Sequence, residues 1–110
     1  MNHTDHSDPD ALLLEQMREA GSDLNKLHRP EFIFDIAHAN DVDNLADALT
    51  ELSFDVAVYE PEIAGEMFQV VAQCEMVLTL PTLQSLSAEF HTLAEKHHAV
   101  YDGWGAEVVE

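Results

Sequence analysis

The chain has 110 residues, which is enough for one domain with a single hydrophobic core, and 46% of them are hydrophobic. Its 22 acidic and 4 basic residues give a formal net charge of −18. Such a surface repels nucleic acids and anionic membranes, because binding to either needs Lys and Arg side chains. The charge favours association with a basic protein, although high net charge also simply keeps many proteins soluble and monomeric.

The sequence also lacks the features of membrane, secreted and disulfide-bonded proteins. No apolar run reaches the roughly 20 residues that a membrane-spanning helix needs, and residues 1–8 lack the basic and apolar regions of a signal peptide. The single cysteine, Cys74, excludes an internal disulfide and fits a reducing compartment. We therefore expect a cytoplasmic protein that is a monomer or a weak dimer and contacts neither nucleic acid nor membrane directly.

The first elements are a tail and a helix. Residues 1–7 are polar and predicted to be disordered, so residues 8–110 are expected to form the single domain. Ser7 or Asp8 can cap a helix that carries Pro9 in its first turn. Gly21 is well placed to end that helix, and residues 21–30 are expected to form a loop.

After Pro30, strand-like and helix-like patterns alternate. Period-two spacing of hydrophobic residues predicts strands over 31–39, 54–59, 68–78 and 99–109. Helical spacing predicts one helix from Asn40 or Asp41 to about residue 52, and another from Pro81 to about residue 98. The segment 68–78 is the longest and most regular, which is typical of a central strand.

The resulting order is a helix followed by β-α-β-β-α-β, which predicts an α+β protein of the ferredoxin-like class. Its sheet would have four antiparallel strands with two helices on one face, and the N-terminal helix would be added to this unit. Polar residues on the other face of the sheet predict that it is partly open; these are Asp35, Gln69, Gln73 and Glu75, with Tyr59 and Tyr101 as further candidates.

Metal and catalytic sites are poorly supported. The pairs His3 and His6, and His97 and His98, lack the spacing of common zinc sites. Cys74 alternates with apolar residues and is expected to be a small core residue rather than a nucleophile. No phosphate-binding glycine loop or nucleophile elbow occurs. We therefore expect no enzymatic activity, no cofactor and no metal.

The segment Tyr101-Asp102-Gly103-Trp104-Gly105 is the best candidate for a binding site. Glycines in a strand mark a bulge, a bend or a close approach of another backbone. Trp104 is either a core residue or, with Tyr101, an aromatic anchor for a partner. Strand alternation would place the two rings on opposite faces unless a bulge intervenes, so both interpretations stay open.

This segment, preceded by Leu93-Ala94-Glu95-Lys96, resembles the C-terminal signature of a ribonuclease E inhibitor family, the regulator of ribonuclease activity B family. Gly21-Ser22-Asp23 is similar to the loop before that family's first strand, and the similarity spans roughly residues 10–108. The resemblance implies a ferredoxin-like fold. It also implies a cytoplasmic, non-enzymatic protein that binds the large endoribonuclease of bacterial RNA decay and reduces its cleavage activity.

The resulting hypothesis is an acidic regulator that binds a ribonuclease E-type endoribonuclease or another basic protein. Tyr101, Asp102 and Trp104 are its predicted protein-binding residues, and the acidic helix faces would steer the encounter. One alternative is a small-molecule or metal-binding ferredoxin-like module, which would need a cleft with converging polar groups. Another is an immunity-type inhibitor of a different basic nuclease, which would use the same electrostatics.

Overall fold

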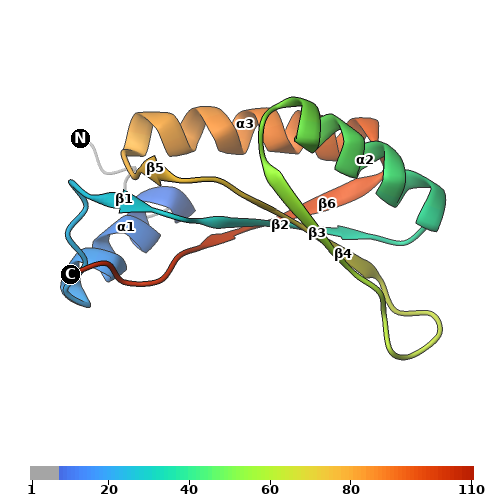
Figure 1. The fold of residues 1–110 in the computed structure, drawn as a ribbon, viewed down its shortest axis with the longest axis horizontal. Helices are drawn as coiled ribbons and strands as arrows, with labels where there is room; N and C mark the ends of the chain where they lie inside the picture. The colour runs from blue at the N-terminus through green and yellow to red at the C-terminus, as the bar shows by residue number, and fades with distance from the viewer. Residues whose placement is uncertain (1–7) are drawn as a thin grey trace.

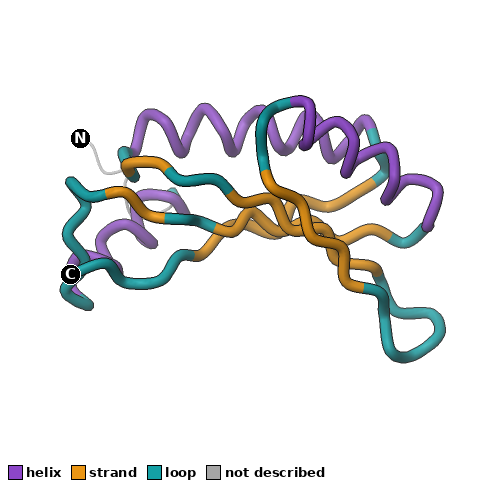
Figure 2. Tube along the Cα trace, in the orientation of Figure 1, coloured by secondary structure: helices purple, strands orange, loops and turns teal. Residues whose placement is uncertain are grey.

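A computed structural model describes residues 8–110, which form three helices and six strands (Figures 1 and 2). In chain order these are α1 (Pro9–Glu19), β1 (Leu27–His28), β2 (Glu31–Ile36), α2 (Ala39–Glu51), β3 (Asp55–Tyr59), β4 (Phe68–Gln73), β5 (Met76–Val77), α3 (Leu80–Lys96) and β6 (Ala99–Gly105). Four strands form an antiparallel sheet in the order β3-β4-β2-β6, and β1 pairs with β5 in a second, small sheet. The predicted α+β class and four-stranded antiparallel sheet are confirmed.

One hydrophobic core joins the sheet to the helices. Helices α2 and α3 lie on the same side of the four-stranded sheet (Figure 1). Phe90 of α3 is fully buried, and its ring centroid lies 5.0 Å from that of Phe32 and 5.4 Å from that of Phe34, both in β2. Helix α1 packs against α3, and its buried Leu14 and Met17 join the same core. The buried residues of α2 and α3 therefore cover one face of the sheet, and those of α1 extend the same core beside α3.

The N-terminal helix forms where the sequence predicts it. The Asp8 side chain accepts a hydrogen bond from the backbone N–H of Asp10 at 2.9 Å, and Pro9 occupies the first turn. At the other end Gly21 has φ +98°, a conformation that glycine adopts without steric cost. The backbone N–H of Ser22 donates to the Met17 carbonyl oxygen at 3.0 Å, as in a Schellman motif.

The prediction of one continuous strand over 68–78 is wrong, and Pro30 explains why. Strand β4 pairs with β2 only as far as Gln73, whose partner is Glu31. The next residue along the partner chain is Pro30, which has no backbone N–H to donate to a ladder. Pairing resumes beyond the break, where β5 pairs with β1, so the predicted loop over residues 21–30 also contains a short strand.

The last strand is also shorter than predicted. Strand β6 ends at Gly105, which pairs with Glu31, the first residue of β2. The following residues run beside the loop after α1 instead. There the Asp23 N–H donates to the Val109 carbonyl oxygen at 2.6 Å, and the Val109 N–H donates to Ser22 Oγ at 3.1 Å. The C-terminal residues therefore fasten the Gly21-Ser22-Asp23 loop.

Helix α2 begins at Ala39, slightly before the predicted start. His38 holds the N-cap position and makes no side-chain capping hydrogen bond. Neither Asn40 nor Asp41 serves as the cap. Asp41 instead lies in the first turn, where its carboxylate is 3.3 Å from Nδ1 of His98.

A bulge in β6 decides the placement of its aromatic residues. The register with β2 shifts so that Ile33 faces Gly103 while Phe34 faces Tyr101, which leaves Asp102 as the extra residue. Gly103 has φ +110°, which favours glycine at this position. Because of the bulge, Tyr101 and Trp104 both point into the core, and the prediction that Tyr101 belongs to the open face of the sheet is wrong.

A groove between α1, α3 and β6 as the candidate binding site

Helix α1, the middle of α3 and strand β6 enclose a groove of about 620 Å³. Its lining includes all three sequence-predicted residues, Tyr101, Asp102 and Trp104. The volume lies within the range typical of ligand and side-chain pockets in proteins. The bulge and the two aromatic rings thus lie beside a concave surface, which makes this groove the candidate site.

Asp10 is the polar centre of the groove wall. Asp10 as a whole is only 6% exposed, and its carboxylate accepts hydrogen bonds from Trp104 Nε1 and from Ser87 Oγ, each at 2.9 Å. Burial of a carboxylate is costly unless such bonds replace its hydration. Asp10 also lies in the first turn of α1, where the helix dipole favours a negative charge. Within residues 8–110 it has no ion-pair partner, so the two neutral donors and the helix end stabilise it.

Asp8 ties the same helix end to α3 a second time. Gln84 Nε2 donates a hydrogen bond to Asp8 Oδ2 at 2.5 Å. This hydrogen bond holds the pKa of the Asp8 carboxyl below its ordinary value. The start of α1 is therefore held by side chains of both α3 and β6.

The three predicted residues occupy different environments. Trp104 and Tyr101 are each 8% exposed, and their rings lie 6.5 Å from Phe32 and 5.2 Å from Phe34, respectively. Burial raises the pKa of the Tyr101 hydroxyl, which has no hydrogen-bond partner among residues 8–110. Asp102 is exposed at the bulge. The two aromatic residues therefore form the groove wall, and Asp102 is the member that solvent reaches.

Sequence reasoning missed Asp10 and Ser87. Asp10 follows a capping residue and a proline, a position where acidic residues are common for helix-dipole reasons alone. Its contact with Trp104 joins residues 94 positions apart in the chain. An acidic residue with apolar neighbours in the first helical turn was the only available signal, and that signal does not identify a partner.

The other sequence candidates lie away from the groove or outside the described region. His98 is paired with Asp41, and partial burial raises the pKa of the Cys74 thiol. His3 and His6 lie outside the described residues. Within residues 8–110 there is no group of three or more His, Cys, Asp or Glu side chains placed to hold a metal ion, and none of the three helices has the length and hydrophobicity to cross a membrane.

Together these features define a small, acidic α+β protein with a groove between α1, α3 and β6. The comparison with protein families identifies which one. A family model described as "Regulator of ribonuclease activity B" matches residues 7–106, and the chain belongs to that family. This is a family of regulators of ribonuclease activity. No curated protein sequence matches the chain.

The capping role of Asp8 leads to a prediction about stability. Replacing Asp8 with alanine should lower the free energy of unfolding by about 1 kcal/mol, because the first turn of α1 loses its cap. Asp8→Asn keeps a capping oxygen but does not titrate. The pKa of Asp8 is lowered in the folded state, so its ionised form stabilises the protein above the ordinary value of 3.8, and this contribution disappears as the pH falls through the folded-state pKa.

Urea unfolding of the wild type and Asp8→Asn at several pH values tests this assignment. The stability advantage of the wild type over Asp8→Asn should shrink below about pH 4. A constant difference across that range would show that the ionised Asp8 makes no contribution of its own.

Proposed function

We propose that this protein binds a basic segment of a ribonuclease E-type endoribonuclease and thereby lowers its cleavage of RNA. The observation that carries the proposal is membership of the family of regulators of ribonuclease activity. The net charge of −18 supplies the physical reason for choosing a basic segment of the enzyme.

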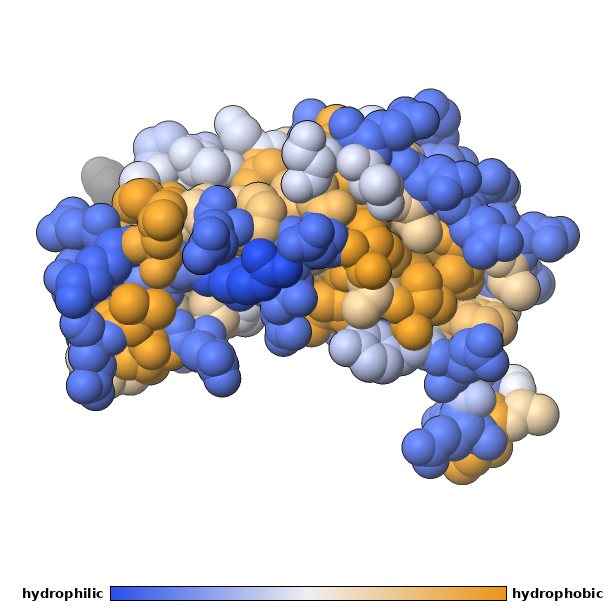
Figure 3. Space-filling view, viewed as in Figure 1, coloured by the Kyte–Doolittle hydropathy of each residue, from blue (hydrophilic) through white to orange (hydrophobic). Residues whose placement is uncertain are grey.

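The few cations of the chain offer little compensation for its negative charge. Arg18 pairs with Glu15 at 3.1 Å, and Arg29 pairs with Asp55 at 2.5 Å. Lys26 Nζ donates to the carbonyl oxygen of Glu110 at 2.6 Å. Most of the acidic residues are therefore available to attract a cationic partner. In Figure 3 hydrophilic side chains cover α2, whereas the loop between β3 and β4 shows hydrophilic and hydrophobic residues together.

The groove supplies the local chemistry of the proposed contact. Asp8 and Asp102 contribute carboxylates, and the exposed Leu12 contributes an apolar surface beside them. A Lys or Arg side chain fits such a site, because its aliphatic part packs on apolar atoms while its charged end reaches a carboxylate. Tyr101 and Trp104 would act by shaping the wall, and Asp102 would make a direct contact. A bound segment would then hinder access of RNA to the enzyme.

The main alternative is a module that binds a small molecule, because the groove is large enough to hold one. Against it, the polar atoms of Asp10, Ser87 and Trp104 already bond to one another, so they would have to exchange these bonds to hold a ligand. An immunity-type inhibitor of another basic nuclease relies on the same electrostatics and differs only in its target. The binding test below separates it from the ribonuclease E proposal.

We further infer that the main sheet and its two crossover helices form a ferredoxin-like unit within a single domain of residues 8–110. The strand order β3-β4-β2-β6 and the placement of α2 and α3 on one side support this assignment. A cytoplasmic location and a monomeric or weakly dimeric state complete the proposal, since strong mutual repulsion opposes self-association.

The function is tested by titrating the full-length chain into a purified ribonuclease E-type endoribonuclease and measuring both binding and RNA cleavage. We expect the wild type to bind and to slow cleavage. Asp102→Asn should weaken binding about threefold to tenfold, which corresponds to the loss of one contact at an interface. Asp43→Asn is the matched control, because this exposed carboxylate lies on α2, away from the groove.

Trp104→Phe separates the structural role from the binding role. It removes the donor to Asp10 and should lower the free energy of unfolding by about 1–3 kcal/mol. The affinity of the folded variant for the ribonuclease should stay close to that of the wild type. If the wild type binds another basic nuclease but not a ribonuclease E-type enzyme, the immunity-type alternative replaces the proposal. Absence of binding to any basic nuclease would refute both.

A further inference from the structure

The face of the main sheet opposite the helices carries three rows of residues, each crossing all four strands. One row contains Tyr59, Gln69, Asp35 and Val100, the middle row contains Ala57, Val71, Ile33 and Gly103, and the third contains Asp55, Gln73, Glu31 and Gly105. These twelve residues are called the open face. The sequence predicted that this side of the sheet would be partly open, and the burial of the helices' apolar residues in the core on the other side agrees with that prediction.

The middle row is apolar across the whole sheet. Val71 is only 6% exposed although it is not part of the main hydrophobic core. Tyr59 and Val100 lie at opposite ends of the neighbouring row and are 56% and 58% exposed. Ala57, Ile33 and Gly103 are partly exposed, so the middle row is a partly accessible apolar strip between polar rows. Single exposed hydrophobic residues are common, whereas apolar strips bordered by polar residues are found at interaction surfaces.

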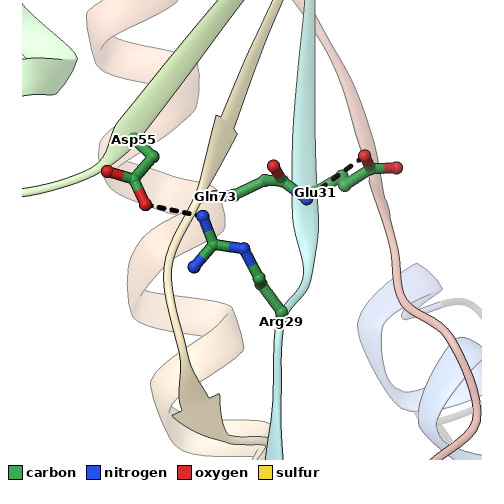
Figure 4. Close-up of polar contacts among 4 residues, drawn as sticks. All are labelled: Arg29, Glu31, Asp55 and Gln73. Atoms are coloured by element: carbon green, nitrogen blue, oxygen red, sulfur yellow. Dashed lines mark hydrogen bonds and ion pairs between the residues drawn. The ribbon is translucent and has the colours of Figure 1, made fainter.

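The third row is already organised by polar contacts (Figure 4). Arg29, which precedes β2, pairs with Asp55, and Gln73 Nε2 donates to Glu31 Oε2 at 3.2 Å. Arg29, a cation beside this face, is therefore neutralised by Asp55. Asp35, on the other side of the apolar row, has no ion-pair partner among residues 8–110 and is partly exposed.

We propose that the open face is a second docking surface for a cationic segment of the ribonuclease. The apolar side chains of that segment would cover the middle row, and its Lys or Arg side chains would reach Asp35 and Glu31. The inference deepens the proposed function and rests on it. The charge favours a cationic segment over a second copy of this chain as the occupant. A second copy would bring another net charge of −18 and the same carboxylates to the interface, and the two would repel each other.

The open face is continuous with the groove. Gly103 belongs to the middle row and also lines the groove, together with the neighbouring Asp102. A partner segment that contacts Asp102 can therefore run over the bulge onto the sheet without leaving the protein surface. The bulge that turns Tyr101 and Trp104 inward thus also joins the two proposed contact surfaces.

Two pairs of variants test the proposal with the full-length chain and a purified ribonuclease E-type endoribonuclease. Asp35→Asn should weaken binding about threefold to tenfold, whereas Asp47→Asn, with the same change of charge on the exposed side of α2, should change it less than about twofold. Val100→Lys should weaken binding by at least as much as Asp35→Asn, with Val108→Lys as its control. All four positions are at least partly exposed, and circular dichroism checks that each variant is folded.

The outcomes separate this inference from the function on which it rests. Equal effects of Asp35→Asn and Asp47→Asn, together with no effect of Val100→Lys, would overturn the open-face proposal while leaving ribonuclease binding intact. Loss of wild-type binding altogether would overturn the proposed function as well. A dimer in sedimentation experiments that Val100→Lys dissociates would assign the face to a second copy and also overturn the proposal.

Discussion

Replacing Phe90 with alanine is expected to lower the free energy of unfolding by about 3–5 kcal/mol. Phe90 is fully buried, and four aromatic rings surround it at centroid distances of 5.0 to 5.5 Å. These rings belong to Phe32, Phe34, Phe54 and Tyr101, so the alanine would leave a cavity between α3, two strands of the sheet and the residue that precedes β3.

Chemical denaturation of Phe90→Ala, with Glu89→Ala as the control, measures this effect. Glu89 is the exposed neighbour on α3, and its replacement should change stability by less than about 0.5 kcal/mol. A loss below about 1.5 kcal/mol for Phe90→Ala would mean that the surrounding rings close the cavity and that the core is not organised around this residue.

The second large effect concerns the rate of association with the ribonuclease. Raising the ionic strength from about 10 mM to about 150 mM shortens the Debye length from roughly 30 Å to roughly 8 Å. Because the surface carries a net charge of −18 and two of its four cations are in ion pairs, the association rate constant should fall about tenfold or more.

Stopped-flow or surface-based kinetics at several salt concentrations tests this prediction. The dissociation rate should change much less, because rim charges and long-range attraction act mainly on the encounter. Potassium chloride and sodium chloride should give the same result if screening is the cause. An association rate that does not change with salt would show that the acidic residues serve solubility and not recognition.

The agreement between sequence and structure has local causes. The limits of α1 were predictable because Asp8, Pro9 and Gly21 each impose a backbone or hydrogen-bonding preference on their own neighbourhood. The antiparallel sheet was predictable because alternating hydrophobic residues mark a half-buried strand. The resemblance to a family of ribonuclease regulators rested on a short glycine-containing segment, and the family match over residues 7–106 confirms it.

The differences arise where a residue acts on a distant part of the chain. Pro30 interrupts the ladder between β2 and β4, although β4 lies about 40 residues further along the chain. From the sequence alone, Pro30 predicts only an interruption of its own strand and not the effect on the strand that pairs with it. The hydrogen bond from Trp104 to Asp10 was likewise outside the reach of local patterns. Gly103 indicated a possible bulge, but only the register with β2 shows that Asp102 is the extra residue.

The Trp104–Asp10 contact also orders events during synthesis. The first helix is synthesised early, yet the donor for its buried carboxylate lies in β6, 94 positions further along the chain. Until that strand is made, the apolar side of α1 has no finished surface to cover. We therefore expect the native contacts of α1 to form only after β6 is translated, and nascent chains arrested before that point to expose this helix to chaperones and proteases.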